Sequence, residues 1–361
     1  MQIDFAKLQY QYQLYKTEID EAIHAVLDKS NYIMGEEVKA LEESLQTFTE
    51  AKHAITCSSG TDALLLAMMA LDIQPGDEII TTPFTFIATA ETIAFLGAIP
   101  VFVDIDEKTY NIDPLKIEEK ITNKTKAIMP VSLYGQPADM DALQTIANNH
   151  NLKIIVDGAQ SFGSTYKGKS DSNLGDISTT SFFPAKPLGC FGDGGAVFTN
   201  NDALATKMKS LRVHGQSKRY HHQYIGIGGR MDTLQCAIVN VKLKYYEKDL
   251  ALRQEVARKY TKALKEKNII LPFLNEEATS AWAQYSVRVQ NRDEVQSKLK
   301  EQGIPTAVHY PMPLHLQECF SYLGQGKGDF PICEQVSNEI MSLPMNPYIS
   351  NNEIAYIKQK I

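Results

Sequence analysis

The chain has 361 residues, of which 43% are hydrophobic and 22% are charged, and these ordinary proportions exclude a wholly disordered protein. Its 36 basic and 43 acidic residues give a net charge of −7, and the scattered basic residues argue against a nucleic-acid-binding surface. The five cysteines are widely spaced without a CxxC pair, so the sequence predicts neither a disulfide framework nor a zinc site.

The N-terminus has no apolar segment behind a basic start, so no signal peptide is indicated. The most apolar stretch, residues 92–103, is interrupted by Gly97 and Pro100 and is too short to cross a bilayer. We therefore expect a soluble, cytoplasmic protein with no membrane or nucleic-acid partner.

From about residue 53 to 200, short apolar runs alternate with helix-compatible segments. The runs cover 53–57, 78–82, 100–104, 126–133, 153–157, 177–183 and 195–199, and the helical segments include 62–71, 88–96 and 140–149. Several runs are apolar on both faces, as at Ile154-Ile155-Val156, which is typical of central strands covered by helices. This alternation predicts an α/β domain with a mostly parallel sheet.

After Arg230 the pattern changes to apolar residues spaced three, four and seven apart over 234–264, which predicts a long helical tract connecting two domains. A shorter α+β pattern follows, with a strand over 282–289, a helix over 292–302 and a strand into His309 and Tyr310. We therefore expect two domains with a ligand site in the cleft between them. The large α/β domain with its N-terminal helical segment would cover 1–250, and the small α+β domain would cover 251–361.

The first segment with chemical meaning covers residues 56–65, where a strand ends, small polar residues turn and a helix begins. Gly60 permits close approach of the backbone to a ligand, and the free N–H groups of a helix's first turn form an anion site. The alternative is that Thr61 or Asp62 only caps the helix. Neither a G-x-G-x-x-G nor a P-loop pattern is present to support the anion site.

Two further segments carry ionisable groups. Asp157 ends a buried strand, at the sheet edge where α/β proteins bind ligands, and could be a structural cap or the counter-charge of a protonated heterocycle. Lys186 lies among two phenylalanines, two prolines and a leucine, and Pro184 and Pro187 exclude a regular helix around it. Desolvation lowers the pKa of a lysine, and the neutral amine is the nucleophile that forms a Schiff base.

Together, an anion site, a carboxylate at a strand end and a desolvated lysine match the needs of pyridoxal phosphate. The phosphate would bind at the helix start, Asp157 would keep the ring nitrogen protonated and Lys186 would bind the aldehyde. Phe86, which follows another strand end, is available to cover the ring.

In these residues the chain resembles the DegT group of pyridoxal phosphate-dependent sugar-nucleotide aminotransferases, which have fold type I. The matching motifs lie in order along nearly the whole chain, at residues 32–35, 59–64, 76–78, 85–86, 134–135, 157–160 and 181–189. Within the family, residues 182–189, 213–216, 219–222 and 307–311 are most similar to members that aminate UDP-2-acetamido-2-deoxy-3-oxo-D-glucuronate. The resemblance implies a large domain with a mostly parallel sheet, a smaller C-terminal domain, and glutamate as the amino donor in the biosynthesis of surface polysaccharides such as lipopolysaccharide O-antigen.

The resemblance also implies roles for individual residues. Lys186 would be the catalytic residue that binds the cofactor aldehyde and moves the proton. Cofactor contacts would come from Gly60, Thr61, Asp62, Phe86, Asp157, Gln160, Ser181, Lys186 and Gly228. Sugar-nucleotide contacts would come from Tyr220, His221, Arg230, His309 and Tyr310. The loop over 219–230 would reach into the neighbouring site of a homodimer.

The chain departs from the family pattern at two positions. The family's Gly-x-Asn-x-Arg reads Gly226-Ile227-Gly228-Gly229-Arg230 here, so the asparagine expected to bind the phosphate across the dimer is replaced by Gly228. One hydrogen bond to a charged group contributes about 1.5–3 kcal/mol, so looser cofactor binding is expected unless water fills the gap. Relatives often carry histidine where this chain has Asn346.

Several alternatives remain open. A 4-keto nucleotide sugar or a dTDP carrier would use the same cofactor site, and a regulatory protein could bind the cofactor without catalysis. An NAD-dependent sugar epimerase or dehydrogenase would share the α/β pattern, but the chain lacks its glycine fingerprint. No metal site is expected, because Asp104-Ile105-Asp106 and His221-His222 have no further ligands at suitable spacing.

Overall fold

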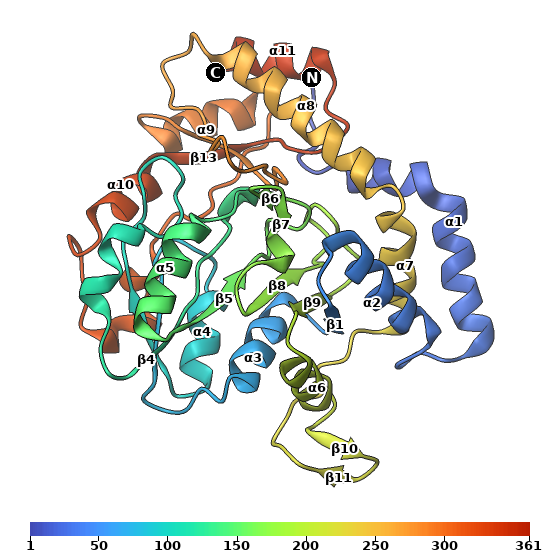
Figure 1. Cartoon of the computed structure of the whole chain (residues 1–361). Helices are drawn as coiled ribbons and strands as arrows, with labels where there is room; N and C mark the ends of the chain where they lie inside the picture. Colours follow the sequence, from blue (N-terminus) through green and yellow to red (C-terminus); the bar gives the residue numbers. More distant parts are fainter.

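A computed structural model describes all 361 residues and has a seven-stranded sheet at its centre (Figure 1). The strand order is β1-β9-β8-β5-β4-β2-β3. These strands are β1 (His53–Cys57), β2 (Glu78–Thr81), β3 (Ile99–Phe102), β4 (Thr125–Ile128), β5 (Lys153–Asp157), β8 (Ile177–Ser181) and β9 (Gly195–Thr199). Only β9 runs antiparallel to its neighbours, β1 and β8. The mostly parallel sheet predicted from the alternating pattern is confirmed.

Helices cover both faces of this sheet. One face packs against α3 (Gly60–Ala70), α4 (Ala88–Phe95) and α6 (Asp202–Leu211), and the other against α2 (Glu36–Thr49), α5 (Met140–His150) and α7 (Thr233–Leu243). Successive residues of β5 alternate between the two cores, since Ile155 packs on the first side and Ile154 and Val156 pack on the second. The strand needs apolar residues on both faces because both faces are covered.

Strand β4 is shorter than the apolar run that predicts it. It ends at Ile128 instead of residue 133, and Pro130, which has no N–H to donate to a neighbouring strand, follows closely. Beyond it, only the bridge between Val131 and Asp157 continues the pairing. The chain then turns through a short 3-10 segment, which brings Tyr134 towards the end of β5.

The 3-10 segments are η1 (Pro114–Lys116), η2 (Glu118–Lys120), η3 (Leu133–Gly135), η4 (Asp171–Asn173), η5 (Leu314–Leu316) and η6 (Glu318–Leu323).

The long helical tract expected after residue 230 consists of two helices, α7 and α8 (Tyr246–Leu264), with a break at Lys244 and Tyr245. Helix α7 packs against α2 and against the N-terminal helix α1 (Leu8–Lys29). Helix α8 contributes Val256, Tyr260 and Leu264 to a separate C-terminal core. The tract therefore contacts both parts of the molecule, as expected of a connector.

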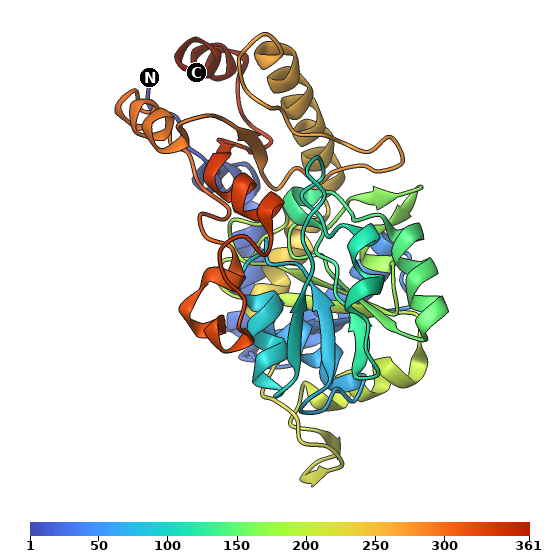
Figure 2. The same ribbon diagram turned by 90° about the vertical axis from the view of Figure 1, so that its left-hand side faces the viewer.

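The C-terminal core is built by the antiparallel pair β12 (Tyr285–Arg288) and β13 (Ile340–Leu343) with α8, α9 (Arg292–Glu301) and α11 (Asn351–Lys360). Ile3 from the N-terminus also packs in this core. A domain boundary near residue 250 would fall inside α8, and it stays a prediction. Helix α10 (Pro331–Glu339) packs instead beside the β3 edge of the large sheet, where Phe320 and Phe330 meet Phe102 (Figure 2).

The expected strand into His309 and Tyr310 is wrong. Only Ala307 pairs with the sheet, through a bridge to Ser342, and the chain then leaves the strand direction. Pro311 and Pro313 have no N–H, so this segment cannot donate a regular ladder of hydrogen bonds.

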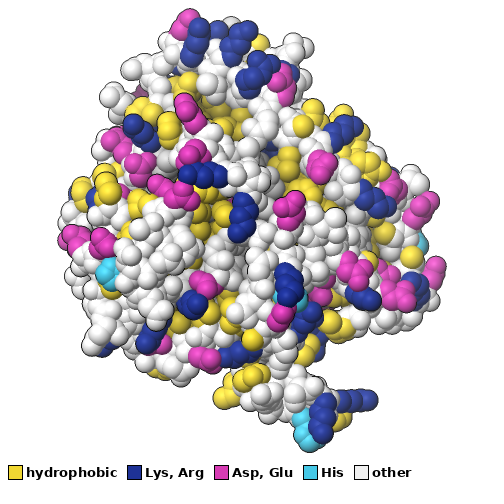
Figure 3. Space-filling model, in the orientation of Figure 1, with side chains coloured by type: hydrophobic (Ala, Val, Ile, Leu, Met, Phe, Trp, Pro, Cys, Tyr) yellow, Lys and Arg dark blue, Asp and Glu magenta, His cyan; other side chains and the backbone are white.

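Two small hairpins lie outside the main sheets. One is β6 (Thr165–Tyr166) with β7 (Lys169–Ser170), and the other is β10 (Gln216–Lys218) with β11 (His221–His222). The second projects from the body of the molecule beside α6 in both views (Figures 1 and 2). Lysine and arginine side chains are scattered over the face shown in Figure 3, without one concentrated basic patch. None of the helices combines the length and the apolar character that a membrane span requires.

Candidate active site

The predicted site segments follow the carboxyl ends of β1, β2, β5 and β8, which meet at one edge of the sheet. The backbone at the start of α3 lies directly against the end of β8. A Cβ atom placed on Gly60 would lie only 2.7 Å from the Cβ of Ser181, so this contact requires glycine.

The start of α3 has free backbone donors. Ser59 is the N-cap, and its side chain accepts a hydrogen bond of 3.0 Å from the N–H of Asp62. The alternative that Thr61 or Asp62 caps the helix is therefore wrong, because Ser59 already accepts that bond. The N–H groups of Gly60 and Thr61 have no acceptor in the structure, and the helix dipole adds partial positive charge there. This arrangement suits an anion.

Asp157 is buried at the end of β5 and is held by two donors. The hydroxyl of Thr89 donates to Oδ2 at 2.7 Å, and the N–H of Ala159 donates to Oδ1 at 3.2 Å. Burial raises the pKa of Asp157, while both hydrogen bonds and the charge of Lys186 oppose that rise. Sequence reasoning missed Thr89. Its position on the first turn of a helix that follows a strand end was the available signal.

Gln160 joins the large sheet to the C-terminal part of the chain. Its Oε1 accepts a hydrogen bond of 2.7 Å from the N–H of Tyr134, and its Nε2 donates to the hydroxyl of Tyr310 at 3.1 Å. The Tyr310 ring lies 6.1 Å from the ring of Phe86, which remains 55% exposed. Tyr134 also donates its hydroxyl hydrogen to the carbonyl of His309. These contacts bring four of the predicted site residues together, namely Phe86, Gln160, His309 and Tyr310.

Lys186 lies on a loop that closes on itself. The N–H of Cys190 donates to the carbonyl of Phe182 at 2.7 Å, and a Cβ atom on Gly189 would lie 2.6 Å from the carbonyl oxygen of Pro184. The Nζ atom of Lys186 has no hydrogen bond or ion-pair partner in the protein. Burial lowers its pKa, and the charge of Asp157 partly opposes this effect. The amine is therefore available as a nucleophile or base.

Electrostatic effects link Lys186 to the neighbouring side chains. Burial lowers the pKa of His309 to about 4, and the positive charge of Lys186 contributes to this shift. His309 is therefore neutral near pH 7, and its Nδ1 lies 3.0 Å from the hydroxyl of Ser342. Burial and the nearby Asp157 raise the pKa of Tyr310, so its hydroxyl stays protonated.

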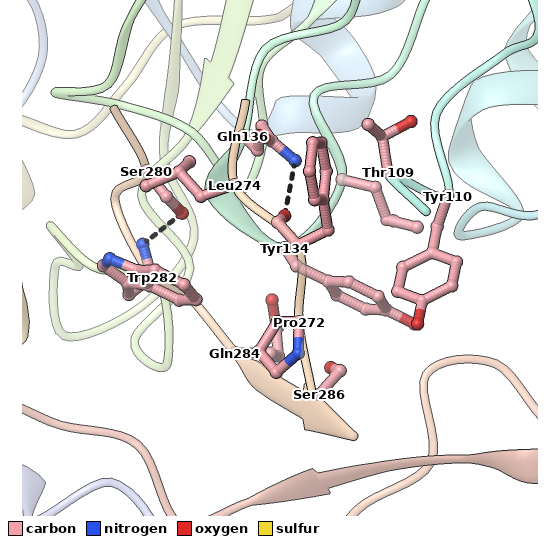
Figure 4. Close-up of a pocket in the computed structure, with 12 residues that line it drawn as sticks. Thr109, Tyr110, Tyr134, Gln136, Pro272, Leu274, Ser280, Trp282, Gln284 and Ser286 are labelled. Carbon is pink, nitrogen blue, oxygen red and sulfur yellow. Dashed lines mark hydrogen bonds between the residues drawn. The ribbon is translucent and has the colours of Figure 1, made fainter. Parts of the chain in front are cut away.

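Two cavities adjoin this region. A cavity of about 80 Å³ is lined by Lys186 and His309 together with Arg253 and Gln284, among other residues. A smaller cavity of about 20 Å³ lies beside Tyr134 and Trp282, and Gln284 also lines it (Figure 4). The smaller cavity includes none of the predicted site residues.

The remaining predicted residues do not join this cluster within one chain. Tyr220 and His221 lie on the projecting β10–β11 hairpin and are exposed, Tyr220 to 76%. Gly228 is exposed beside His214, and Arg230 is half-buried without a hydrogen-bond partner. The carbonyl of Gly229 accepts a hydrogen bond of 3.0 Å from the N–H of Ser58, so this segment does pass close to the start of α3.

Asn346, to which the sequence assigns no role, is fully buried and holds the N-terminal segment. Its Nδ2 donates to the carbonyl of Phe5 at 3.1 Å, and its Oδ1 accepts from the N–H of Tyr348 at 2.9 Å. Asn346 therefore keeps Phe5 and Tyr348 in place, and both line the larger cavity beside Lys186.

The family described as DegT/DnrJ/EryC1/StrS aminotransferases matches residues 13–361. The chain is 50% identical over 355 residues to a UDP-2-acetamido-2-deoxy-3-oxo-D-glucuronate aminotransferase of Pseudomonas aeruginosa, covering 98% of each sequence. It is 44% identical over 364 residues to a pleiotropic regulatory protein of Geobacillus stearothermophilus, covering 100% of this chain and 98% of that one.

Solved structures agree closely with the fold. A DegT DnrJ EryC1 StrS aminotransferase from Brucella abortus has a TM-score of 0.95 and 38% identity, with 99% of this chain and 98% of that one covered. NtdA from Bacillus subtilis, solved with bound pyridoxamine phosphate, has a TM-score of 0.93 and 32% identity, with 99% of this chain and 84% of that one covered.

Proposed function

The chain belongs to the DegT/DnrJ/EryC1/StrS aminotransferase family, and from this membership we propose that it converts the keto group of a 3-keto nucleotide sugar to an amine. The family and the aminotransferase class predicted from the sequence motifs are confirmed. Fold type I is confirmed as well. The similarity to the P. aeruginosa enzyme supports a UDP-linked 3-keto uronate as the substrate.

The cofactor is pyridoxal phosphate, and the residues present fit it. The free N–H groups of Gly60 and Thr61 suit its phosphate, the buried carboxylate of Asp157 suits a protonated ring nitrogen, and the unpartnered Nζ of Lys186 suits its aldehyde. When bound, this cofactor supplies an electron sink for charge that develops on the reacting carbon.

The single observation that carries the proposal is the free amine of Lys186, lowered in pKa and next to Asp157. The lowered pKa increases the share of neutral amine at Nζ, and a neutral amine can accept a proton from a substrate carbon and return it to another atom. The Tyr134 and Gln160 hydrogen bonds fix the positions of His309 and Tyr310 around this amine. Burial favours the free base of Lys186, and the charge of Asp157 partly opposes this effect.

We also propose the amino donor, the assembly and the pathway of the enzyme. Glutamate is the amino donor, and the enzyme is a homodimer in which the segment over 219–230 completes the neighbouring site with Tyr220, His221 and Arg230. The missing side chain at Gly228 leaves a gap in the phosphate contacts that water fills. The product is an amino sugar for surface polysaccharide, such as lipopolysaccharide O-antigen, made in the cytoplasm.

One experiment tests the reaction and the substrate. The enzyme, loaded with cofactor, is mixed with 2-oxoglutarate and a panel of UDP- and dTDP-linked 3-amino and 4-amino sugars, and glutamate formation is measured. We expect the fastest formation with a UDP-linked 3-amino uronate and none with Lys186→Ala. Faster turnover of 4-amino sugars would contradict the 3-keto assignment.

A regulatory protein without catalysis is the second candidate, because the chain is 44% identical to a pleiotropic regulatory protein. The same assay separates the two, since a regulator would bind the cofactor and yet form no glutamate with any sugar. The presence of Lys186, Asp157 and Gln160 in one cluster favours catalysis.

A further inference from the structure

Arg253 on helix α8 is a buried cation without a direct ion-pair partner. Arg253 is only 6% exposed. No carboxylate oxygen lies within 4 Å of its guanidinium. Its only hydrogen bond runs from Nη1 to the carbonyl of Trp282, at 2.9 Å. The Nε atom is buried and has no partner. A guanidinium has five N–H donors and stays protonated in proteins, so most of its binding capacity is unused.

The acidic residue one helical turn earlier favours the charge of Arg253 only at longer range. Asp249 accepts hydrogen bonds from Gln11 at 3.0 Å, from Tyr15 at 3.3 Å and from Tyr348 at 3.0 Å, and it makes no ion pair with Arg253. A charge that is buried and unpaired is costly, so a residue kept in this state points to an anion that binds from outside the chain.

Arg253 lines the cavity of about 80 Å³ that Lys186 and His309 also line. Gln284 lines the same cavity, and its side chain makes no hydrogen bond in the structure, with Oε1 buried. Figure 4 shows Gln284 from the side of the smaller cavity, between Pro272 and Ser286. The larger cavity therefore has an unpaired cation and an unpaired amide in its wall, next to the reactive amine.

We propose that Arg253 and Gln284 bind a carboxylate group of a substrate in this cavity, beside Nζ of Lys186. A guanidinium matches a carboxylate with two parallel N–H donors, and the amide of Gln284 can add a third donor. The inference rests on the proposed aminotransferase function and specifies one binding group within it. Two substrates of that reaction can supply the carboxylate, namely the amino-acid donor and a uronate sugar.

Binding without chemistry tests the site first. Glutarate, a dicarboxylate that lacks an amino group, is titrated into the cofactor-loaded enzyme by calorimetry. For Arg253→Gln we expect the Kd for glutarate to rise about 10- to 100-fold, the loss expected when a charge-assisted hydrogen bond is removed. Arg258→Gln is the matched control, because Arg258 lies on the same helix but is exposed and paired with Glu255. The Kd of Arg258→Gln for glutarate should equal that of the wild type.

Single-turnover kinetics then distinguish the two sources of the carboxylate. If the donor supplies it, Arg253→Gln slows conversion of the enzyme-bound cofactor by L-glutamate and leaves the reverse reaction with a UDP-3-amino uronate unchanged. If the sugar supplies it, the glutamate reaction stays at the wild-type rate. In that case Arg253→Gln reacts more slowly with the UDP-3-amino uronate and at the wild-type rate with the matching neutral UDP-3-amino sugar.

A second variant covers the case in which Arg253→Gln does not fold. Gln284→Glu places a negative charge in the cavity wall, so it should weaken glutarate binding by a similar factor. Wild-type affinity and rates in whichever of these variants fold would overturn the proposal. A wild-type enzyme that shows no reaction with any amino donor or amino sugar would instead overturn the proposed function, so the two failures are distinguishable.

Discussion

Thr89 donates a hydrogen bond of 2.7 Å to the buried carboxylate of Asp157 and is itself in contact with the hydroxyl of Thr85 at 2.8 Å. Thr89→Val removes one of the two donors that stabilise the ionised carboxylate while it keeps nearly the same shape. The pKa of Asp157 should therefore rise further, and Asp157 should pair less well with a protonated cofactor ring. We expect cofactor to dissociate about 10-fold more readily, as measured by absorbance during dialysis or titration.

Thr92→Val is the control for this prediction. Thr92 is also buried on α4, but its hydroxyl donates within the helix to the carbonyl of Ala88 at 2.8 Å. Cofactor affinity should stay at the wild-type value in Thr92→Val. Equal affinity in both variants would mean that the Thr89 hydroxyl has no part in holding Asp157 ionised.

His309 makes the folding stability depend on pH. Its pKa is about 4 in the folded protein and 6.5 in the unfolded chain, so the unfolded state binds more protons between these values. The free energy of unfolding should therefore fall as the pH drops from 6.5 towards 4, by no more than about 3 kcal/mol from this group. His309→Gln should lose this contribution, as measured by urea denaturation at pH 4.5 and 7.

The buried carboxyl of Asp171 has the opposite effect, because burial raises its pKa to about 6 and stability then falls as the pH rises from 4 to 6. This contribution is present in both the wild type and His309→Gln, so it cancels in their difference. His24→Gln, on the exposed surface of α1, should follow the wild-type pH dependence. The prediction fails if the stability of His309→Gln has the same pH dependence as that of the wild type.

The loop over 182–190 depends on a lysine of helix α7. Lys242 on α7 is buried, donates through Nζ to the carbonyl of Gly189, and lies 5.6 Å from the ring centre of Phe191. Burial lowers the pKa of Lys242 to about 8. Since Gly189 belongs to the loop that carries Lys186, this contact positions the amine proposed to be catalytic.

Lys242→Met should leave the fold intact, because methionine fills a similar volume and removes a buried charge. Small displacements of a reacting group are costly, so we expect kcat to fall about 10- to 100-fold with little change in KM and with cofactor still bound. Lys244→Met, an exposed position paired with Glu18, should keep the wild-type kcat. Equal kcat values in the two variants would show that Gly189 is held well enough without Lys242.

The sequence predicts the sheet and its covering helices well because their signals are local. Alternating apolar runs define the strands, and Gly97, at a φ of +73°, ends α4 where the pattern indicates. The irregular segments cannot be predicted in this way, because their course depends on contacts with distant residues. Trp282 accepts a hydrogen bond from Arg253, and Ala307 pairs with Ser342, so the residues beside Trp282 and Ala307 do not indicate the path of the chain.

The same distinction applies to the site. Asp157, Lys186 and Gly60 can be recognised because the residues beside them already suggest their chemistry. Thr89 is 68 residues from the carboxylate that it contacts, and Tyr134 is 175 residues from His309. Such pairs are formed only by folding, so the helix start after a strand end marks Thr89 as a candidate but does not predict its contact with Asp157.

Most side chains over 219–225 are exposed, where a partner chain would cover them. Tyr220, at the turn of the hairpin that projects away from the rest of the chain, is 76% exposed, and Ile225, three residues after β11, is 93% exposed (Figure 2). Large apolar side chains in this state favour a protein interface. If the segment completes the neighbouring site, a single chain holds two halves of different active sites.

Complementation between two inactive variants tests this arrangement. Lys186→Ala lacks the amine and Arg230→Ala lacks the proposed substrate contact, so each homodimer should have little activity. After the two are mixed and subunits exchange, heterodimers have one site with both defects and one intact site. Activity should recover to about a quarter of the wild-type value, because half of the dimers are mixed and each has one working site of two. If Arg230 instead serves the site of its own chain, every site keeps one defect and mixing restores nothing, whereas recovery requires that the site be shared.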